Sequence, residues 1–142
     1  LKKLLFLLLF YHLFGFSQSV NPWVKSSTSE KNNVLQNRNQ ISTNFQVYNL
    51  DISVLKNALA NSPKRGGYLQ KSSTVIEFPN AEGKLERFSI FEASVMHPDL
   101  QAKYPSIRSY AGKGIDDPTA TIRFSISQLG LKTMTISAGK NA

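Results

Sequence analysis

Apolar and polar residues alternate without a break in the stretch Thr119-Ala-Thr-Ile-Arg-Phe-Ser-Ile-Ser127. Successive side chains of a β-strand point to opposite faces of a sheet, so this pattern predicts a strand with one buried and one solvated face. The residues Gln128-Leu129-Gly130 favour a turn, and Leu131, Met134 and Ile136 indicate that another strand follows. Because antiparallel sheets commonly bury only one face, we expect an antiparallel meander at this end of the chain.

A β-hairpin is predicted upstream of the meander. Residues 74–79 and 84–93 both show strand patterns, and the turn residues Asn80-Ala81-Glu82-Gly83 lie between them. A further strand is expected to start over residues 107–110, followed by a loop over residues 112–118. These elements would form one small antiparallel sheet.

A short helix is predicted after a strand over residues 41–50. Asp51 stands where a helix N-cap belongs, and the apolar positions that follow it are spaced so as to share one helix face. These positions are Ile52, Leu55, Ala58 and Leu59. The sequence Asn61-Ser62-Pro63 is expected to end this helix.

A second short helix is predicted at His97-Pro98-Asp99, since proline and an acidic residue are both favourable in a first helical turn. It should be short, because Pro105 disfavours helical geometry at Tyr104. The predicted fold class is therefore α+β, with a small antiparallel sheet and two short helices.

The first seventeen residues follow the pattern of a secretory signal peptide. Lys2 and Lys3 precede an apolar run from Leu4 to Phe14, and Gly15-Phe16-Ser17 offers small residues before a cleavage point. The run is shorter than the ~20 residues that span a bilayer. The alternative, a buried core helix, would show a polar face. We expect cleavage by signal peptidase after Ser17, contact with the membrane only during export, and a secreted or cell-surface location.

Three segments are expected: a signal peptide over residues 1–17, a flexible arm over 18–40 and an α+β domain over 41–142. The arm is rich in Ser, Asn and Lys and carries few apolar residues, among them Trp23. The chain ends in a strand pattern without a stop signal, so we expect the domain to be truncated at its C-terminal end.

The composition argues against several functional classes. The 142-residue chain has a formal net charge of +8, but its basic residues are scattered, and Lys64-Arg65 is the only adjacent basic pair after the signal. No basic stripe interleaves with aromatic residues, so nucleic acid is not an expected partner. The chain contains no cysteine, which excludes thiol nucleophiles and Cys-ligated zinc within it.

No catalytic or cofactor-binding constellation is predicted. His97 is the single histidine after the signal, and the His-Glu-x-x-His zinc motif is absent. Gly112-Lys113-Gly114 with Asp116-Asp117 fits a tight turn better than a phosphate or calcium site. No Gly-x-Ser-x-Gly motif is present. Four glutamates could offer paired carboxylates, but nothing enforces their pairing, and we expect them on the wet face, edge or turn of the hairpin. They are Glu77, Glu82, Glu86 and Glu92.

The block from Phe88 to Gly114, which contains Met-His-Pro-Asp-Leu-Gln-Ala-Lys-Tyr-Pro, and its continuation through Asp116 to Gly130 carry a resemblance to a known family. They resemble the N-terminal pro-region of secreted reprolysin-like zinc metalloproteases from Bacteroidetes-type bacteria. The resemblance implies a domain that assists folding of a downstream metalloprotease domain and keeps it inactive until removal. Zinc would be bound in that missing catalytic domain. No catalytic or zinc-binding residue of the family carries over to this chain.

Two functions therefore stay open from the sequence. The first is a signal peptide plus propeptide of a secreted zinc metalloendopeptidase, recorded as a fragment. Without a cysteine its inhibition would be steric or use another ligand, for which His97 and Asp99 are candidates. The second is a free-standing exported binding module, either a protease inhibitor or an adhesion domain, that recognises its partner by strand addition at an exposed sheet edge.

Overall fold

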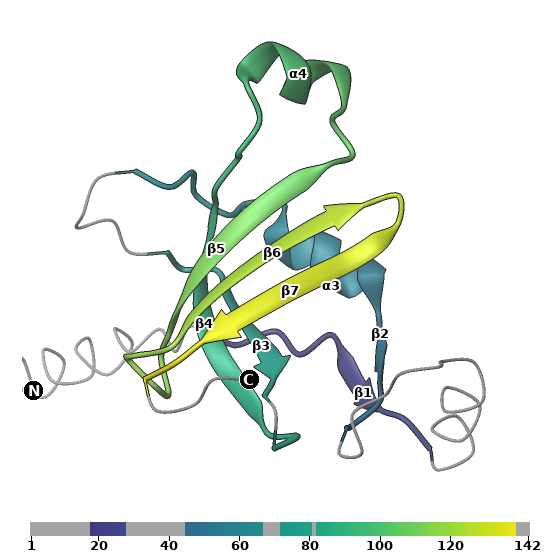
Figure 1. Ribbon diagram of the computed structural model, residues 1–142, viewed down its shortest axis with the longest axis vertical. Coiled ribbons are helices and arrows are strands. Elements are labelled where there is room, and N and C mark those ends of the chain that lie inside the picture. The colour runs from purple at the N-terminus through teal and green to yellow at the C-terminus, as the bar shows by residue number, and fades with distance from the viewer. Residues whose placement is uncertain (1–17, 28–44, 67–71, 81, 139–142) are drawn as a thin grey trace, which may run out of the picture.

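One curled antiparallel sheet, in which strands consecutive in sequence lie side by side, forms the body of the fold (Figure 1). The computed structural model describes residues 18–27, 45–66, 72–80 and 82–138. The predicted signal peptide over residues 1–17 lies outside the described residues. So do residues 28–44, which hold much of the predicted arm and the first part of the strand expected over residues 41–50.

The main sheet has five strands in the order β3-β4-β5-β6-β7, each antiparallel to its neighbour. The strands are β3 (Val75–Pro79), β4 (Leu85–Glu92), β5 (Arg108–Gly114), β6 (Thr121–Ser127) and β7 (Gly130–Ile136). The predicted hairpin is β3-β4 and the predicted meander is β5-β6-β7. The predicted fold class, a small antiparallel sheet with two short helices, is confirmed.

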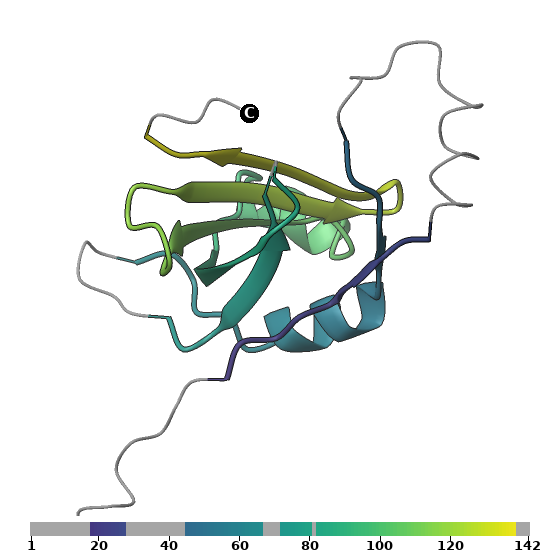
Figure 2. The same ribbon diagram turned by 90° about the horizontal axis from the view of Figure 1, so that it is seen from below.

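The first helix, α3 (Ile52–Leu59), covers the inner face of this sheet (Figure 2). Its N-cap is Asp51, as predicted, and one carboxylate oxygen accepts hydrogen bonds from the backbone N–H groups of Ser53 and Val54, both at 3.0 Å. Leu55 and Leu59 are buried against the strands. Burial of this apolar helix face holds α3 in place, because an eight-residue helix is marginal in water by itself.

The core lies between α3 and the inner face of the sheet. Alternate residues of β6 point into it, so the alternation in residues 119–127 is confirmed as the pattern of a half-buried strand. The rings of Tyr110 and Phe124 stack with their centroids 5.0 Å apart. The buried cluster is Leu55, Leu59, Ile76, Phe78, Phe88, Ile90, Tyr110, Ala120, Ile122, Phe124 and Ile126.

The flexible arm predicted over residues 18–40 is wrong for residues 18–27, which pack on the main body. Trp23–Lys25 forms strand β1, antiparallel to β2 (Tyr48–Leu50). The Trp23 indole N–H donates to the carbonyl of Glu77 at 2.7 Å, and its ring lies 5.7 Å from that of Phe78. Few apolar residues are needed for this docking, because one large aromatic side chain and backbone hydrogen bonds supply the contact.

The second helix, α4 (Pro98–Lys103), lies in the excursion between β4 and β5 and stands away from the sheet (Figure 1). It begins at Pro98 and ends before Pro105, as predicted, and none of its residues is buried. The Gln101 side chain ties the excursion together. Its amide nitrogen donates to the carbonyls of Ile107 at 2.7 Å and Tyr104 at 3.2 Å, and its oxygen accepts from the Ser94 hydroxyl at 3.0 Å.

The loop predicted over residues 112–118 begins later than expected, because β5 continues through Gly114. Gly112 lies within the strand, at a position where a larger side chain would not fit. A Cβ atom on it would lie 2.6 Å from Ile90 Cδ1 and 2.8 Å from Ile122 Cγ2. The glycine therefore allows close packing across the core rather than a turn. The chain turns only after it, between β5 and β6.

Candidate functional site

His97 and Asp99, the candidate inhibitory ligands, lie together at the start of α4. His97 is the N-cap, and its Nδ1 accepts a hydrogen bond from the backbone N–H of Asp99 at 3.4 Å. That nitrogen is also 3.4 Å from the Asp99 carboxylate, and the side chains are 75% and 93% exposed. The structure thus places both groups on an exposed tip. The described residues contain no group of three or more His, Cys, Asp and Glu side chains placed to hold a metal ion.

The glutamates of the hairpin are not brought together as a catalytic pair. Glu77 accepts a hydrogen bond from the Ser19 hydroxyl at 2.6 Å, and Glu86 accepts one from the Asn80 amide at 2.6 Å. Glu92 forms an ion pair with Arg108 at 2.5 Å. Each of these three carboxylates therefore accepts a hydrogen bond from a different residue.

The two aspartates of the β5–β6 loop hold that loop in place, in agreement with the predicted tight turn. Asp116 pairs with Arg87 of β4 at 2.5 Å and also accepts the Arg87 backbone N–H at 2.7 Å. The Arg87 side-chain hydrogen bond, followed by that backbone hydrogen bond, lowers the pKa of Asp116 below its usual value. Asp117 accepts from the Thr119 backbone N–H at 2.9 Å and hydroxyl at 2.7 Å. These contacts orient β6 after the turn.

The two edges of the main sheet differ. At the β3 edge, the N-terminal segment makes a parallel bridge in which Val20 donates to Val75 and accepts from Glu77, both at 2.9 Å. At the other edge, β7 pairs with β6 and with no other strand among the described residues. Exposed apolar side chains lie along it, since Met134 and Ile136 are 55% and 53% exposed. An edge strand of this kind can accept a further strand.

A hollow of about 630 Å³ lies beside the β4–β5 excursion. Its walls are the excursion itself, the segment that contains Lys64 and Arg65, and Arg123 of β6. Backbone hydrogen bonds link that segment to the end of β4, because Arg65 donates to the carbonyl of Glu92 at 2.7 Å and Glu92 donates to that of Pro63 at 2.9 Å. The apolar residues that line the hollow are Ala93, Val95, Met96, Pro98, Ala102 and Pro105.

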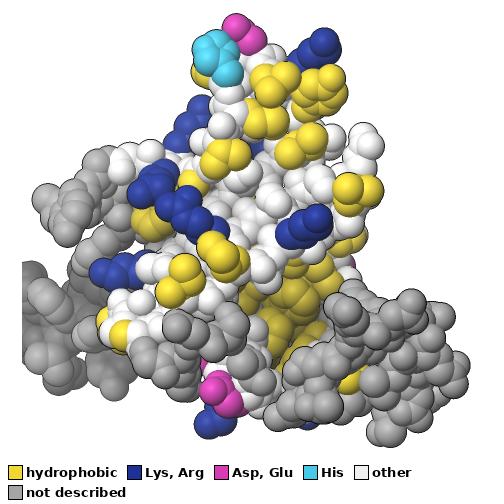
Figure 3. Space-filling view, in the orientation of Figure 1, with side chains coloured by type: hydrophobic (Ala, Val, Ile, Leu, Met, Phe, Trp, Pro, Cys, Tyr) yellow, Lys and Arg dark blue, Asp and Glu magenta, His cyan; other side chains and the backbone are white. Residues whose placement is uncertain are grey.

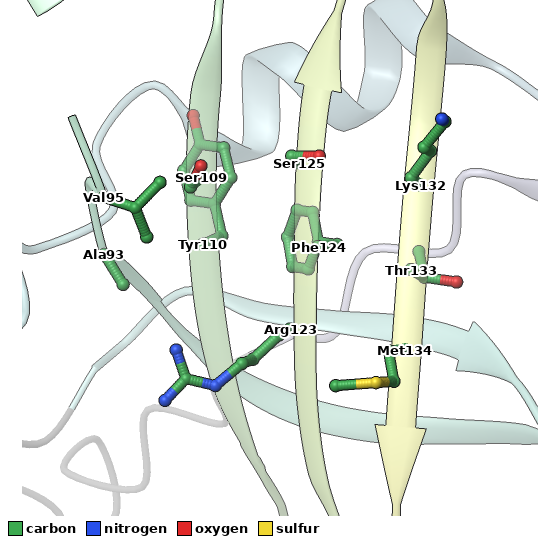
Figure 4. Close-up of a pocket in the computed structure, with 10 residues that line it drawn as sticks. All are labelled: Ala93, Val95, Ser109, Tyr110, Arg123, Phe124, Ser125, Lys132, Thr133 and Met134. Atoms are coloured by element: carbon green, nitrogen blue, oxygen red, sulfur yellow. The ribbon is translucent and has the colours of Figure 1, made fainter.

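A shallower hollow of about 280 Å³ continues over the outer face of the sheet (Figure 4). It shares Ala93, Val95 and Arg123 with the larger one, so the two hollows adjoin, and together they are called the outer groove hereafter. Arg123 extends from β6 across β5 toward the side where Ala93 lies, and Met134 extends from β7 toward β6 (Figure 4). Lys132 of β7 lines the far end.

The surface around the outer groove is basic. In Figure 3, Lys and Arg side chains are spread over the middle of this face, whereas acidic side chains are seen chiefly toward its upper and lower ends. Four cations line the larger hollow, Lys64, Arg65, Arg108 and Arg123, against one carboxylate, Glu92. Because Glu92 is paired with Arg108, the positive charge of the other three is not offset inside the hollow.

Tyr110 lies next to this ion pair, with its ring in the core. Burial raises the pKa of the Tyr110 phenol above its ordinary value. The Glu92 carboxylate raises the pKa further, while Arg108 opposes the shift. Tyr110 thus remains a neutral, packed side chain over a wide range of pH.

The sequence did not predict the outer groove. One signal was available: Arg123 occupies the polar face of a cleanly alternating strand and was therefore expected to point outward. The remaining walls come from segments far apart in the chain, whose approach no local pattern encodes.

None of the helices among the described residues is both long enough and apolar enough to cross a membrane. No protein-family model, curated protein or solved structure matches this chain.

Proposed function

We propose that this chain is the signal peptide and propeptide of a secreted zinc metalloendopeptidase, and that its folded body is a non-catalytic docking domain. The domain would assist folding of a protease domain encoded downstream, and it would keep that domain inactive until the propeptide is removed. Zinc and the catalytic residues would belong to the protease domain.

The observation that carries this proposal is the open edge of β7. Along the seven-residue strand β7 (Gly130–Ile136), alternate residues point their backbone N–H and C=O groups to the side away from β6, beside the exposed side chains of Met134 and Ile136. A partner strand added there would satisfy these groups and cover the apolar side chains. The β3 edge is less accessible, because Val20 is hydrogen-bonded along it.

The resemblance to metalloprotease pro-regions gives the second support. The quoted block, residues 88–114, includes most of β4, the excursion with α4 and all of β5. It therefore covers the exposed tip with His97 and Asp99 as well as part of the core. In the proposed complex these two side chains are the candidates for contact with the catalytic zinc, because both are exposed.

The proposal is tested first by reading the DNA downstream of the last codon. A continuing frame that encodes a His-Glu-x-x-His zinc protease is expected. An immediate stop codon with no such protease gene nearby would refute the propeptide assignment and favour the free-standing binding module.

The second test is inhibition of that protease domain by the separately purified chain. Ile136→Asp places a carboxylate on the β7 edge, at a side chain that is 53% exposed and does not line the outer groove. It should weaken inhibition by at least about tenfold, because an unpaired charge in an interface is costly. Val24→Asp is the matched control, since Val24 is 66% exposed on β1 and not on β7. Equal loss in both variants, or no inhibition by the parent chain, would contradict docking through β7.

A further inference from the structure

We propose that the outer groove is a second binding site, which takes an extended polypeptide segment carrying carboxylates and apolar side chains. This goes beyond the proposed function, which uses the open edge of β7 and the exposed tip with His97 and Asp99. The site is defined by Lys64, Arg65 and Arg123, with Val95 and Met96 as its apolar part.

Charge complementarity identifies the chemistry of the occupant. Lys64, Arg65 and Arg123 line one hollow and have no acidic partner among the described residues. Arg108 already has a partner in Glu92, at 2.5 Å, and also donates to the carbonyl of Pro105 at 3.1 Å. Carboxylates brought to the three other cations would form charge-assisted hydrogen bonds, and each arginine can bind a carboxylate in a bidentate manner.

The shape of the groove favours a chain over a small anion. The larger hollow, at about 630 Å³, falls within the range of ~300–1,000 Å³ that is typical of ligand sites. The smaller hollow extends it across β5 and β6 to Lys132 and Met134 on β7. Cations and apolar side chains therefore occur along the whole length of the groove, which suits a peptide with acidic and apolar residues.

Hydrogen bonds and a backbone bridge tie the walls of the groove to the sheet. Gln101 holds the two ends of the excursion together through its bonds to Ser94 and Ile107. Lys64 forms a parallel bridge with Glu92, which joins the opposite wall to the end of β4. A preorganised site loses less entropy on binding than a site that must first become ordered.

The lining also favours a peptide over a nucleic acid. None of the described residues that line the larger hollow is aromatic, and the two aromatic residues at the smaller hollow, Tyr110 and Phe124, are buried in the core. Single-stranded nucleic acids are bound chiefly by stacking of bases on aromatic side chains, in addition to contacts with phosphates. Apolar contact from Val95 and Met96 suits leucine or valine side chains instead.

The test uses the purified chain and a fluorescein-labelled hexapeptide of alternating glutamate and leucine, followed by fluorescence anisotropy. The same peptide with glutamine in place of glutamate should bind at least about tenfold more weakly. Arg123→Gln and Arg65→Gln should each weaken binding of the acidic peptide about five- to tenfold. Lys113→Gln is the matched control, because it removes one positive charge from the exposed part of β5 and Lys113 does not line the groove.

Three outcomes would overturn the proposal. One is equal binding of the acidic and glutamine peptides. Another is a loss in Lys113→Gln as large as that in Arg123→Gln, which would indicate attraction by net charge alone. The third is displacement of the peptide by a short single-stranded oligonucleotide at lower concentration than by unlabelled peptide, which would assign the groove to nucleic acid. None of these results depends on a protease, so they leave the test of the proposed function independent.

Discussion

Trp23 should anchor the N-terminal segment, and its replacement gives the sharpest test of that docking. Trp23→Ala removes the indole hydrogen bond to the Glu77 carbonyl and the ring contacts with Phe78 and Tyr48. Trp23→Phe removes the hydrogen bond but keeps an aromatic ring in place. The two variants therefore separate the polar from the packing contribution.

The expected loss of unfolding free energy follows from these contacts. A hydrogen bond contributes about 1 kcal/mol net. Each aromatic pair adds about 0.5–1.5 kcal/mol beyond its area burial, and Trp23 makes two, with ring centroids 5.7 and 6.5 Å apart. Trp23→Ala should therefore cost about 2–4 kcal/mol, and Trp23→Phe about 1–2 kcal/mol, because the phenyl ring keeps most of the packing.

Urea unfolding followed by far-UV circular dichroism measures both costs. In the parent chain Trp23 is the only tryptophan, so its fluorescence reports on the same segment and should change at the same urea concentration. Val24→Ala is the control, since Val24 is 66% exposed and should cost less than about 0.5 kcal/mol. A Trp23→Ala cost no larger than that of Val24→Ala would refute the docking of residues 18–27.

Three further predictions concern the body of the fold. Raising the pH through and above about 10 should destabilise the parent chain. The pKa of Tyr110 is raised in the folded state, so its contribution to stability is complete below the unfolded pKa and is lost as pH rises through the folded pKa. In a series of urea midpoints measured against pH, Tyr110→Phe should flatten this decline. Gly114→Ala should lower the free energy of unfolding by about 1–3 kcal/mol in urea titrations, because its Cβ would lie 2.1 Å from the backbone oxygen of Asp117, and a parent-like midpoint would contradict that approach. Asp116→Asn should be less stable than the parent at neutral pH and should lose less stability between about pH 5 and pH 2. The lowered pKa of Asp116 stabilises the fold only above the unfolded pKa, and this contribution disappears as pH falls through the folded pKa. Identical acid titrations of stability for the two proteins would argue against the contact with Arg87.

Local patterns predicted the elements whose signals lie within a few residues. Asp51 is an N-cap in the structure because its carboxylate meets free N–H groups two and three residues later. The alternation of residues 119–127 survives because one face of β6 is buried and the other is not. In both cases the pattern that predicts the element and the structural feature that confirms it involve residues only a few positions apart in the sequence.

The predictions that failed depend on contacts between distant residues. The polar composition of residues 18–40 indicated a flexible arm, but two partners of Trp23, Glu77 and Phe78, lie more than fifty residues away. Gly112 looked like part of a loop, yet its place in β5 follows from the nearness of Ile90 and Ile122 on adjacent strands. Composition and glycine content indicate how freely the local backbone can move, but they do not indicate which distant residues will pack nearby.

The open edge of β7 follows from the way the chain uses its own segments. The N-terminal segment packs on the β3 half of the fold, because Val20 bonds along β3 and Trp23 packs on Phe78. On β7, by contrast, Thr133 aligns with the inward Phe124 and is nevertheless exposed, so the core does not extend beneath the middle of this strand. Covering β7 by a partner strand would bury these positions and satisfy its free backbone groups together, which is why the docking proposal is directed there and not at β3.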